Sequence, residues 1–449
     1  MSASLHDVAV LGGGPAGSLT AGGLARLGFT VVLITRPRPH LAFEGLSQRT
    51  LDGLEAAGCE RALGQVGAEV QRRATWGGQA SAANTEFVVD RGAFDQALAA
   101  DAAAQGVEVH AGRVTAVAPA GDRWRLGARL VEGGTRQFAA GFVVEARGRE
   151  APAAGARRRR GPPTTALSRP WALPAGAGAQ TAVAAFARGW AWLAAPGDGR
   201  AVLQLFVASG RGRLPPRREL EDYYARRLEE LAEAPEWLRG ASPAGRVSAR
   251  ESTPQIALPL AGPKSLRVGD AALAIDPLSG HGIFEAVGGA LAAAPVINTL
   301  LRRPADRELA TAFYTERAET TFLRHCRVGR DFYAQEERWP EAPFWAERRR
   351  WPDAEPAHRP AQSGAPEIAE RPVIEDGFVV RREVIATPDH PRGVWQVDGV
   401  PLVALLRLVE ALLPGGAEEI RRRAAARLGV PPARVETALA WLRHRGLLR

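Results

Sequence analysis

Residues 7–34 read DVAVLGGGPAGSLTAGGLARLGFTVVLI, and this stretch decides the fold. An apolar run ends at Gly12-x-Gly14-x-x-Gly17, a helix rich in small residues follows, and a second apolar run ends at Ile34. This order predicts a strand, a tight turn, a helix and a strand. Gly12 permits the turn, Gly14 lets a pyrophosphate approach the backbone, and Gly17 lets the helix pack closely on the sheet. We therefore predict a dinucleotide site at the helix N-terminus, where free N–H groups and the positive end of the helix dipole face the phosphates.

Two questions remain open for this motif. A glycine-rich turn between a strand and a helix also occurs without a ligand. In addition, an acidic residue usually ends the second strand and binds the adenine ribose, whereas Thr35 and Arg36 stand at this position here. This departure disfavours NAD held by the ordinary ribose clamp. It also predicts that an FAD ribose is held more weakly, or by residues elsewhere.

The composition indicates a globular protein with room for two or three domains. The chain has 449 residues, 46% of them hydrophobic, and a formal charge of +9, which suits a folded protein of this size. Lys264 is the only lysine, and the run Arg157–Arg160 forms either a solvated loop or a contact with an acidic partner or a cofactor phosphate. Cys59 and Cys326 have no metal-ligand spacing, so we predict isolated thiols in a reducing compartment and no bound metal.

No segment of the sequence predicts export or a membrane span. Residues 1–6 are too short for a signal peptide before the first strand. The apolar run at 271–301 is interrupted by polar or helix-breaking residues at 276, 277, 281 and 285. We therefore expect a soluble, cytoplasmic protein without a membrane contact.

Changes in the pattern of elements divide the chain into five segments. Alternating strand and helix patterns indicate a doubly wound α/β sheet. Apolar strands split by Gly and Pro indicate an antiparallel sheet, and a stretch rich in Pro, Trp and charge indicates a linker or wrapping segment. The predicted segments are residues 1–165 (first part of the α/β domain, with a small excursion into the antiparallel sheet near 75–90), 166–261 (antiparallel sheet), 262–338 (second part of the α/β domain and further helices), 339–374 (linker) and 375–449 (a small module of two strands and three helices).

Three motifs follow one another in a particular order. Gly12–Gly17 comes first, Glu145-Ala-Arg-Gly-Arg149 ends a later strand, and Arg267-Val-Gly-Asp270 precedes Asp276-Pro-Leu-Ser-Gly-His-Gly282. This ordered set resembles the glutathione-reductase-like flavoproteins, in particular the single-component FAD monooxygenases of the hydroxybenzoate hydroxylase type, the flavin-dependent halogenases and the geranylgeranyl reductases. The resemblance covers roughly residues 5–325. It implies a Rossmann FAD domain into which the antiparallel sheet is inserted as a substrate domain.

The resemblance also implies roles for single residues. Asp270 is expected to bind the flavin ribityl chain, and Pro277–Gly282 to lie beneath the isoalloxazine ring, where N–H groups stabilise negative charge. Arg49 and Arg91 are expected to face the cofactor, with surface ion pairs as the alternative. His281 is expected to move protons near the flavin, with a structural role as the alternative. The implied cofactor-binding residues are Gly12, Gly14, Pro15, Ala16, Gly17, Thr35, Arg36, Arg49, Arg91, Val114, Gly148, Gly269, Asp270, Pro277, Gly280, His281, Gly282 and Ile283.

The segment Gly189-Trp-Ala-Trp192 resembles a signature shared by flavin halogenases and their non-halogenating relatives. It makes Trp190 and Trp192 candidates for the substrate pocket, with sheet packing as the alternative. In halogenases an Ile-Pro pair completes the signature, but Ala194-Ala195 stands here, and Lys264 does not match the halogenase lysine. We therefore expect oxygen insertion or reduction rather than halogenation. No second Gly-x-Gly-x-x-Gly follows, which fits NAD(P)H as a reductant that visits the flavin transiently.

The segment 375–449 resembles a winged-helix module of the kind that recognises leader peptides, and such modules offer a strand edge to a peptide. A flavin monooxygenase with this extension resembles the accessory flavoproteins that mature tryptophylquinone enzymes, such as lysine ε-oxidase and quinohemoprotein amine dehydrogenase. The resemblance implies an enzyme that uses FAD, O2 and NAD(P)H to hydroxylate a protein-bound tryptophan, and that binds an immature quinoprotein subunit through residues 375–449. The alternatives are a small-molecule aromatic hydroxylase or isoprenoid-type reductase, and an FAD-binding chaperone without turnover. For the module, the alternatives are a stability cap, a dimer contact, or DNA binding; we expect no nucleic-acid partner.

Overall fold

The computed structural model describes residues 4–152, 155–210, 214–358 and 365–448. The chain forms two compact units. The first comprises Met1–Asn298 and Tyr314–Ala357, and the second comprises Thr299–Phe313 and His358–Arg449. The glycine-rich turn and the antiparallel sheet both belong to the first unit.

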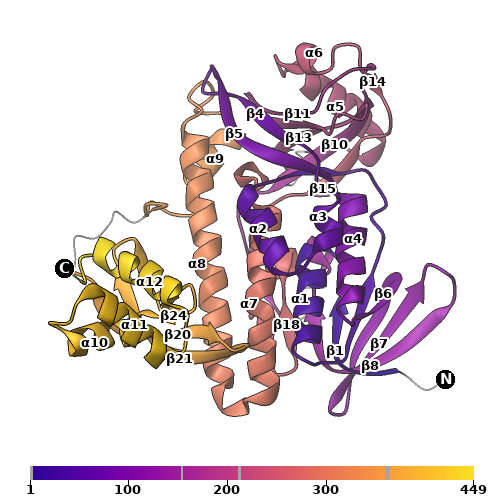
Figure 1. The fold of residues 1–449 in the computed structure, drawn as a ribbon. Helices are drawn as coiled ribbons and strands as arrows, with labels where there is room; N and C mark the ends of the chain where they lie inside the picture. The colour runs from indigo at the N-terminus through magenta and orange to yellow at the C-terminus, as the bar shows by residue number, and fades with distance from the viewer. Residues whose placement is uncertain (1–3, 153–154, 211–213, 359–364, 449) are drawn as a thin grey trace. The chain divides into compact units, whose positions relative to one another are not determined.

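The glycine-rich motif opens a mainly parallel sheet, as the sequence predicts. Val8, Val10 and Leu11 are fully buried, because a strand covered on both faces has no side exposed to water. Helices α1 and α4 pack together beside this sheet (Figure 1). The elements of this region are β1 (Ser4–Leu11), α1 (Pro15–Arg26), β2 (Val31–Thr35), α2 (Gln48–Ala56), α3 (Glu60–Leu63), α4 (Arg91–Ala104), β6 (Glu108–Ala120), β7 (Arg123–Leu130), β8 (Thr135–Glu145), β17 (Ala261–Gly262) and β18 (Ser265–Arg267), with the strands ordered β1-β2-β6-β7-β8-β18-β17 and β1 also paired with β8.

A second, nine-stranded sheet lies where the sequence predicts the antiparallel sheet. It is antiparallel except that β4 pairs in parallel with β11. The excursion predicted near 75–90 begins earlier, because the hairpin of β4 and β5 spans 69–90. Its strands are β3 (Phe43–Leu46), β4 (Glu69–Trp76), β5 (Gln79–Asp90), β10 (Thr164–Ala172), β11 (Gln180–Phe186), β12 (Gly189–Ala195), β13 (Arg200–Ala208), β14 (Ser242–Pro243) and β15 (Ser248–Glu251), in the order β14-β10-β13-β12-β11-β4-β5-β3 with β15 on β10.

Alternate side chains of this sheet pack on its two faces. On one face, Leu203 and Leu205 contact α5 (Leu220–Glu229) and α6 (Ala234–Trp237). On the other face, Trp190 and Phe206 contact side chains of α8 (Arg307–Ala334) and α9 (Pro343–Arg348). Residues 339–357 of the predicted linker therefore pack into the first unit, where Trp345 is fully buried. Residues 359–364 of that linker lie outside the described residues.

The chain returns to the parallel sheet through short elements and one long helix. Arg157–Arg160 forms strand β9, paired with β16 (Gln255–Leu258), instead of the solvated loop that its charge suggests. Helix α7 (Gly282–Arg302) is long and apolar enough to span a membrane, but 67% of its most apolar stretch is buried in the protein, as in a core helix. The remaining elements here are η1 (Gly148–Glu150), η2 (Arg217–Glu219), η3 (Gly269–Ala271), β19 (Leu273–Ala274), η4 (Pro277–Ser279) and η5 (Pro304–Asp306).

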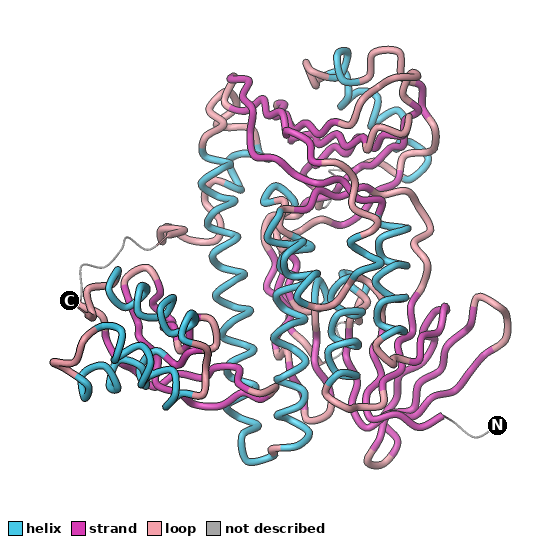
Figure 2. The backbone as a smooth tube through the Cα atoms, in the orientation of Figure 1, coloured by secondary structure: helices cyan, strands magenta, loops and turns pink. Residues whose placement is uncertain are grey.

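The second unit combines strands with three helices (Figure 2). Its core includes Ile385, Leu405 and Leu439. The connection between α7 and α8 belongs to this unit: the Val379 N–H donates a hydrogen bond to Thr299 Oγ1 at 2.9 Å. The elements are β20 (Glu367–Glu375), β21 (Phe378–Thr387), β22 (His390–Val394), β23 (Gln396–Val397), β24 (Val400–Pro401), α10 (Leu402–Leu412), α11 (Ala417–Leu428) and α12 (Pro432–His444).

Candidate functional site

Two adjoining cavities lie within the first unit. The larger, of about 820 Å³, runs past the glycine-rich turn and the end of β2. Its volume is typical of a site for a cofactor or small molecule. The smaller, of about 260 Å³, lies against the antiparallel sheet. Glu44, Arg149, Asp270 and Gly282 line both, so the two cavities share part of their walls.

Glycine is required at the three motif positions for different physical reasons. Gly12 has φ +112°, and a Cβ there would lie 2.4 Å from the Ala146 carbonyl oxygen. A Cβ on Gly17 would lie 1.9 Å from the carbonyl oxygen of Gly12. A Cβ on Gly14 would meet no protein atom within 4 Å, although this residue precedes the first turn of α1 and lines the larger cavity. The first two glycines therefore allow close packing, whereas Gly14 keeps the helix N-terminus open to a ligand.

Asp270 is held at the junction of the two cavities by Arg149. The Arg149 Nε atom lies 3.2 Å from Asp270 Oδ2. The same guanidinium donates to the carbonyl oxygens of Ile275, at 3.1 Å, and Thr253. The Asp270 side chain remains 44% exposed, so its carboxylate is oriented but still able to accept hydrogen bonds from hydroxyl groups.

The larger cavity is rich in positive charge. Arg91 is buried at the start of α4 between Glu44 and Asp95; although burial opposes its charge, the two carboxylates raise the pKa of its guanidinium above the ordinary value. Burial and the charge of Arg250 lower the pKa of His40 to about 4, so its neutral ring accepts a 2.7 Å hydrogen bond from Arg250. The charged groups that line the cavity are Arg36, Arg38, Arg91, Arg113, Arg147, Arg149 and Arg250, against Glu44, Asp95, Glu150, Glu251 and Asp270.

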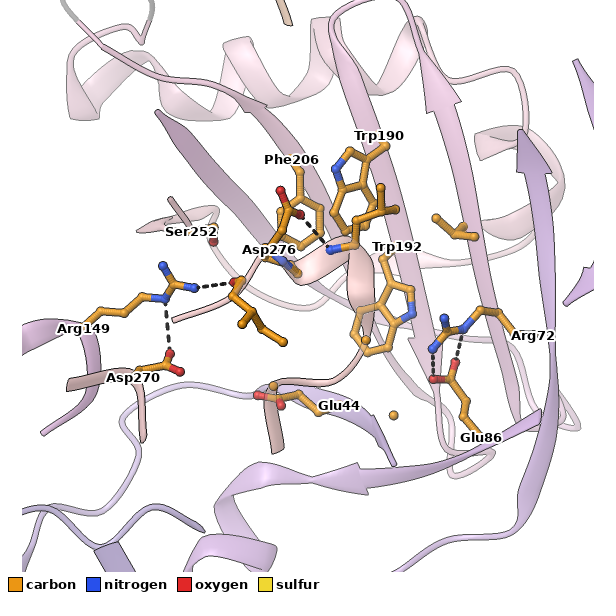
Figure 3. Close-up of a pocket in the computed structure, with 17 residues that line it drawn as sticks. Glu44, Arg72, Glu86, Arg149, Trp190, Trp192, Phe206, Ser252, Asp270 and Asp276 are labelled. Carbon is orange, nitrogen blue, oxygen red and sulfur yellow. Dashed lines mark hydrogen bonds and ion pairs between the residues drawn. The ribbon is translucent and has the colours of Figure 1, made fainter. Parts of the chain in front are cut away.

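The smaller cavity has an aromatic wall and a charged edge (Figure 3). Trp190 stacks on Phe206 with ring centroids 3.8 Å apart, and Trp192 lines the same cavity. Arg72 donates from Nε to Glu86 at 2.9 Å, and this pair lies beyond Trp192. Such a site combines stacking surface for a flat ring with a few fixed polar groups.

Glycine is required at position 189, the first residue of the Gly-Trp-x-Trp segment, for a structural reason. A Cβ there would lie 1.9 Å from the Phe206 carbonyl oxygen. The glycine therefore allows β12 and β13 to approach where Trp190 stacks on Phe206.

Asp276 is the buried carboxylate of the smaller cavity. It accepts hydrogen bonds from the Leu278 N–H at 3.0 Å and from the Tyr333 hydroxyl at 3.1 Å. Burial raises the pKa of Asp276 above its ordinary value. The side chain caps η4, the start of the loop that the resemblance places beneath a flavin ring.

The structure brings most of the predicted cofactor residues together. Thr35 instead packs on Gly13: a Cβ added to Gly13 would lie 2.3 Å from the Oγ1 atom of Thr35. Arg49 is exposed on α2 and is not part of either cavity wall. Trp190 and Trp192 both line the smaller cavity, together with Pro277 and Gly280. The predicted residues on the wall of the larger cavity are Gly12, Gly14, Pro15, Ala16, Gly17, Arg36, Arg91, Val114, Gly148, Gly269, Asp270, Gly282 and Ile283.

His281 is not among the residues that line the two cavities, although Gly280 and Gly282 on either side of it are. Its Nδ1 donates to the Ser279 carbonyl oxygen, and its ring lies 5.7 Å from that of His325. Burial lowers its pKa. The only lysine, Lys264, donates to the Asp122 carbonyl oxygen and lines neither cavity.

Sequence reasoning missed groups that carry no local signal. Strand pairing brings in Arg72, Glu86, Phe206 and Arg250 from a distance, and His40 comes from the loop between β2 and β3. Asp276 does have one, because it stands in the quoted Asp-Pro motif. Within the part of the chain that the structure describes, no group of three or more His, Cys, Asp or Glu side chains is arranged to hold a metal.

Comparison with known proteins finds similarity to FAD-binding proteins and flavin-dependent enzymes. Residues 6–322 match the family described as FAD binding domain. The structure of QhpG, a peptidyl tryptophan dihydroxylase essential for tryptophylquinone cofactor biogenesis, is 41% identical, with 99% of this chain and 100% of that chain covered and a TM-score of 0.80. A tryptophan 2-halogenase of Chondromyces crocatus is 27% identical over 371 residues, 75% of this chain and 69% of that protein. The flavin-dependent halogenase CmlS, at 20% identity, has a TM-score of 0.72 over 100% of this chain and 96% of its own, which indicates a shared fold.

Proposed function

Because the chain belongs to the FAD binding domain family, we propose that it is an FAD-dependent monooxygenase that hydroxylates a tryptophan of another protein during tryptophylquinone biogenesis. The observation that carries this proposal is the similarity to the peptidyl tryptophan dihydroxylase, which extends over the whole chain and includes the C-terminal unit. The same similarity supports a protein as the substrate.

The walls of the larger cavity fit FAD. The open N-terminus of α1 at Gly14 and the surrounding arginines suit a pyrophosphate. Asp270, fixed by Arg149, suits the hydroxyl groups of a sugar-alcohol chain. When bound, FAD supplies the activation of molecular oxygen.

The smaller cavity suits an indole ring. Its volume of about 260 Å³ and its wall of Trp192 and Phe206 allow a flat aromatic side chain to stack and to exclude water. Holding the ring in one orientation supplies most of what oxygen insertion needs from a protein. Asp276, buried and bonded to Tyr333, is a polar group of this wall positioned to hold a proton.

The proposal includes NAD(P)H as a reductant that visits the cleft transiently. It rests on the sequence, which contains one Gly-x-Gly-x-x-Gly turn of the Rossmann kind. Anaerobic mixing of the FAD-loaded protein with NADH or NADPH tests it, because bleaching of the flavin absorbance reports reduction.

The two buried, unpaired thiols, Cys59 and Cys326, support the cytoplasm as the compartment.

We place the docking of the partner on residues 375–449 and the strand before them. Among the described residues, strand β20 is an edge of its sheet and pairs with β21 alone, and Glu367, Ile368, Glu370 and Arg371 are exposed. An exposed edge offers unpaired N–H and C=O groups to an incoming peptide.

Pro372 shows which N–H groups point outward on this edge. Proline is tolerated in an edge strand where its missing N–H would face solvent, and Glu370 lies two residues before it, on the same side of the alternation. Glu370→Pro therefore removes an outward donor and keeps the pairing with β21, whereas Ala369→Pro disrupts that pairing. Loss of partner affinity in Glu370→Pro, with unchanged thermal stability, supports docking at this edge; unchanged affinity excludes it.

Mass spectrometry of the partner tests the reaction itself. The immature quinoprotein subunit is incubated with the protein, FAD, NAD(P)H and O2. We expect one tryptophan of the subunit to gain the mass of oxygen atoms, two for a dihydroxylation like that of the relative, and no halogen mass when bromide or chloride is present. An unmodified subunit contradicts the proposal. In that case oxygen uptake with free aromatic compounds indicates a small-molecule hydroxylase, and binding without oxygen uptake indicates a chaperone.

A further inference from the structure

A row of tryptophan and tyrosine side chains connects the smaller cavity with partly exposed positions of the first unit. Trp190 lines the cavity and donates from Nε1 to the Tyr333 hydroxyl at 3.2 Å. The Tyr333 ring centroid lies 5.9 Å from that of Trp345. From Trp345 the row branches to Trp76, at 5.4 Å, and to Trp339, at 6.1 Å. Trp345 is fully buried, whereas Trp76 and Trp339 are partly exposed.

The chemistry of the row is selective. Tryptophan and tyrosine give up one electron far more readily than phenylalanine. Each step of the row joins two of these oxidisable side chains, and Phe206 and Phe344 lie beside it without interrupting it. The residues come from β12, α8, α9, β4 and the segment before α9, so no local sequence pattern produces the row.

Tyr333 also has a partner for its proton. Its hydroxyl lies 3.1 Å from both carboxylate oxygens of Asp276. An oxidised tyrosine loses its phenolic proton, so a carboxylate at this distance lets the electron leave without stranding a charge in the interior. Burial raises the pKa of Asp276, which makes the carboxylate a better proton acceptor.

We propose that this row is an electron-transfer path that re-reduces Trp190 after an oxidant in the smaller cavity has removed one electron from it. The oxidant is a reactive oxygen species formed beside the flavin when no substrate ring fills the cavity. The reductant is a soluble thiol at the surface. The path protects the wall of the cavity from permanent oxidation.

The electrons and protons balance along the path. Tyr333 gives an electron to oxidised Trp190, while its phenolic proton moves to Asp276. Trp345 then gives an electron to Tyr333, and the proton returns from Asp276. Trp76 or Trp339 re-reduces Trp345, and the thiol supplies the last electron and releases its proton to water. Two oxidised thiols combine as a disulfide, and no proton crosses the protein.

A light-driven experiment tests the path without any hydroxylation, so its outcome is independent of the proposed substrate. The full-length, FAD-loaded protein receives a light pulse that excites the flavin, in oxygen-free buffer without added thiol. Time-resolved absorbance follows the tryptophan and tyrosine radicals. We expect long-lived radicals in the unaltered protein and decay several-fold faster in Trp345→Phe and Tyr333→Phe. Equal lifetimes in all three proteins overturn the proposal.

Trp171→Phe is the matched control. Trp171 is buried in the same sheet but packs on the opposite face, in the cluster of α5 and α6. Its loss removes similar packing without touching the row, so we expect the lifetime of the unaltered protein. Radical decay in Trp171→Phe as fast as in Trp345→Phe attributes the effect to packing and contradicts the proposal.

Peptide mapping gives a second readout in air. After incubation with FAD, NAD(P)H and O2 but no partner, we expect oxidation products at Trp76 and Trp339 in the unaltered protein. In Trp345→Phe the products move to Trp190 and Trp192. The same distribution in both proteins contradicts the path.

Discussion

A substitution at Gly14 is expected to affect cofactor binding without affecting folding. A side chain at Gly14 enters the larger cavity, because no protein atom lies within 4 Å of an added Cβ. We expect Gly14→Val to lower FAD affinity by about tenfold or more, equivalent to ~1.4 kcal/mol, with little change in the thermal unfolding of the protein measured without FAD. In contrast, Gly17→Val forces a clash with the Gly12 carbonyl, and overpacking of this kind typically costs about 1–3 kcal/mol of stability. Flavin fluorescence titration and calorimetry measure the two effects; a Gly14→Val protein that binds FAD normally contradicts the site.

Arg149 is expected to act through its planar, forked geometry rather than through its charge. Its guanidinium bonds to Asp270 and to two carbonyl oxygens at once, which an ammonium group cannot reproduce. We expect Arg149→Lys to weaken FAD binding by about 1.5–3 kcal/mol, the range for hydrogen bonds to charged groups. Arg407→Lys, at an exposed ion pair with Glu383, is the control and leaves the affinity unchanged. Equal affinities in both variants, measured by calorimetry, exclude Arg149 as a positioning residue.

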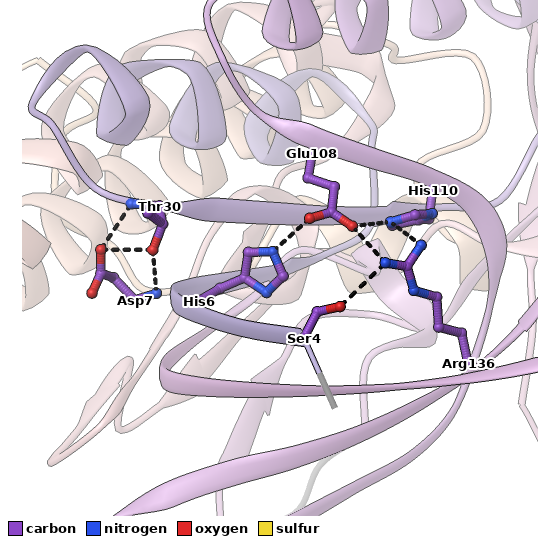
Figure 4. Close-up of polar contacts among 7 residues, drawn as sticks. All are labelled: Ser4, His6, Asp7, Thr30, Glu108, His110 and Arg136. Carbon is purple, nitrogen blue, oxygen red and sulfur yellow. Dashed lines mark hydrogen bonds and ion pairs between the residues drawn. The ribbon is translucent and has the colours of Figure 1, made fainter. Parts of the chain in front are cut away.

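Among the elements, three strands of the parallel sheet are tied together by one carboxylate (Figure 4). Glu108 of β6 accepts from His6 of β1 at 2.8 Å, from His110 at 2.6 Å and from Arg136 of β8 at 3.1 Å. Burial raises the pKa of Glu108, but the hydrogen bonds and charges of His110 and His6 outweigh it and lower the pKa below the ordinary value. The network therefore stabilises the folded state only while Glu108 is ionised.

The expected pH dependence follows from the direction of that shift. A carboxyl group whose pKa is lower in the folded state adds stability above its ordinary pKa of 4.5, and this stability is lost as the pH falls through the folded value. We expect Glu108→Gln to reduce stability at pH 7 by about 0.5–1 kcal/mol, because the group is partly exposed, and the difference to shrink below pH 4.5. Thermal unfolding at pH 7 and pH 3 measures it, with exposed Glu132→Gln as the control. A difference that grows on acidification contradicts the argument.

The elements that sequence predicted best are those with local causes. The strand–turn–helix around Gly14 follows from spacing alone, and the helices of the C-terminal unit follow from apolar periodicity. The wall of the smaller cavity does not: Arg72 and Phe206 meet only because β4, β11, β12 and β13 pair across long stretches of chain. The predicted linker could not be assigned from local sequence for the same reason. Trp345 is buried against a sheet that lies far earlier in the chain: its Nε1 donates to the Phe186 carbonyl oxygen across a separation of 159 residues.

For the whole molecule, removal of the C-terminal unit tests how far the chain is modular. The unit includes Thr299–Phe313, so deletion from residue 358 leaves this segment without the strands that bond to it. We expect the truncated protein to keep its FAD, because both cavities lie in the first unit, and to lose affinity for the partner. We also expect a lower melting temperature and a tendency to aggregate, seen by size-exclusion chromatography. If the truncated protein is as stable as the full chain, the segment Thr299–Phe313 does not need the C-terminal strands for its stability. If the truncated protein keeps its full affinity for the partner, the C-terminal unit serves only as a cap.

Arg149 has one more consequence, because it belongs to the walls of both cavities. A ligand that fixes its guanidinium from one side also sets the shape that the other ligand meets. By thermodynamic reciprocity, a partner protein that prefers the flavin-loaded form must tighten flavin binding by the same factor. Arg149, together with Glu44 and Asp270, is thus a shared wall residue through which binding in one cavity can be linked to binding in the other.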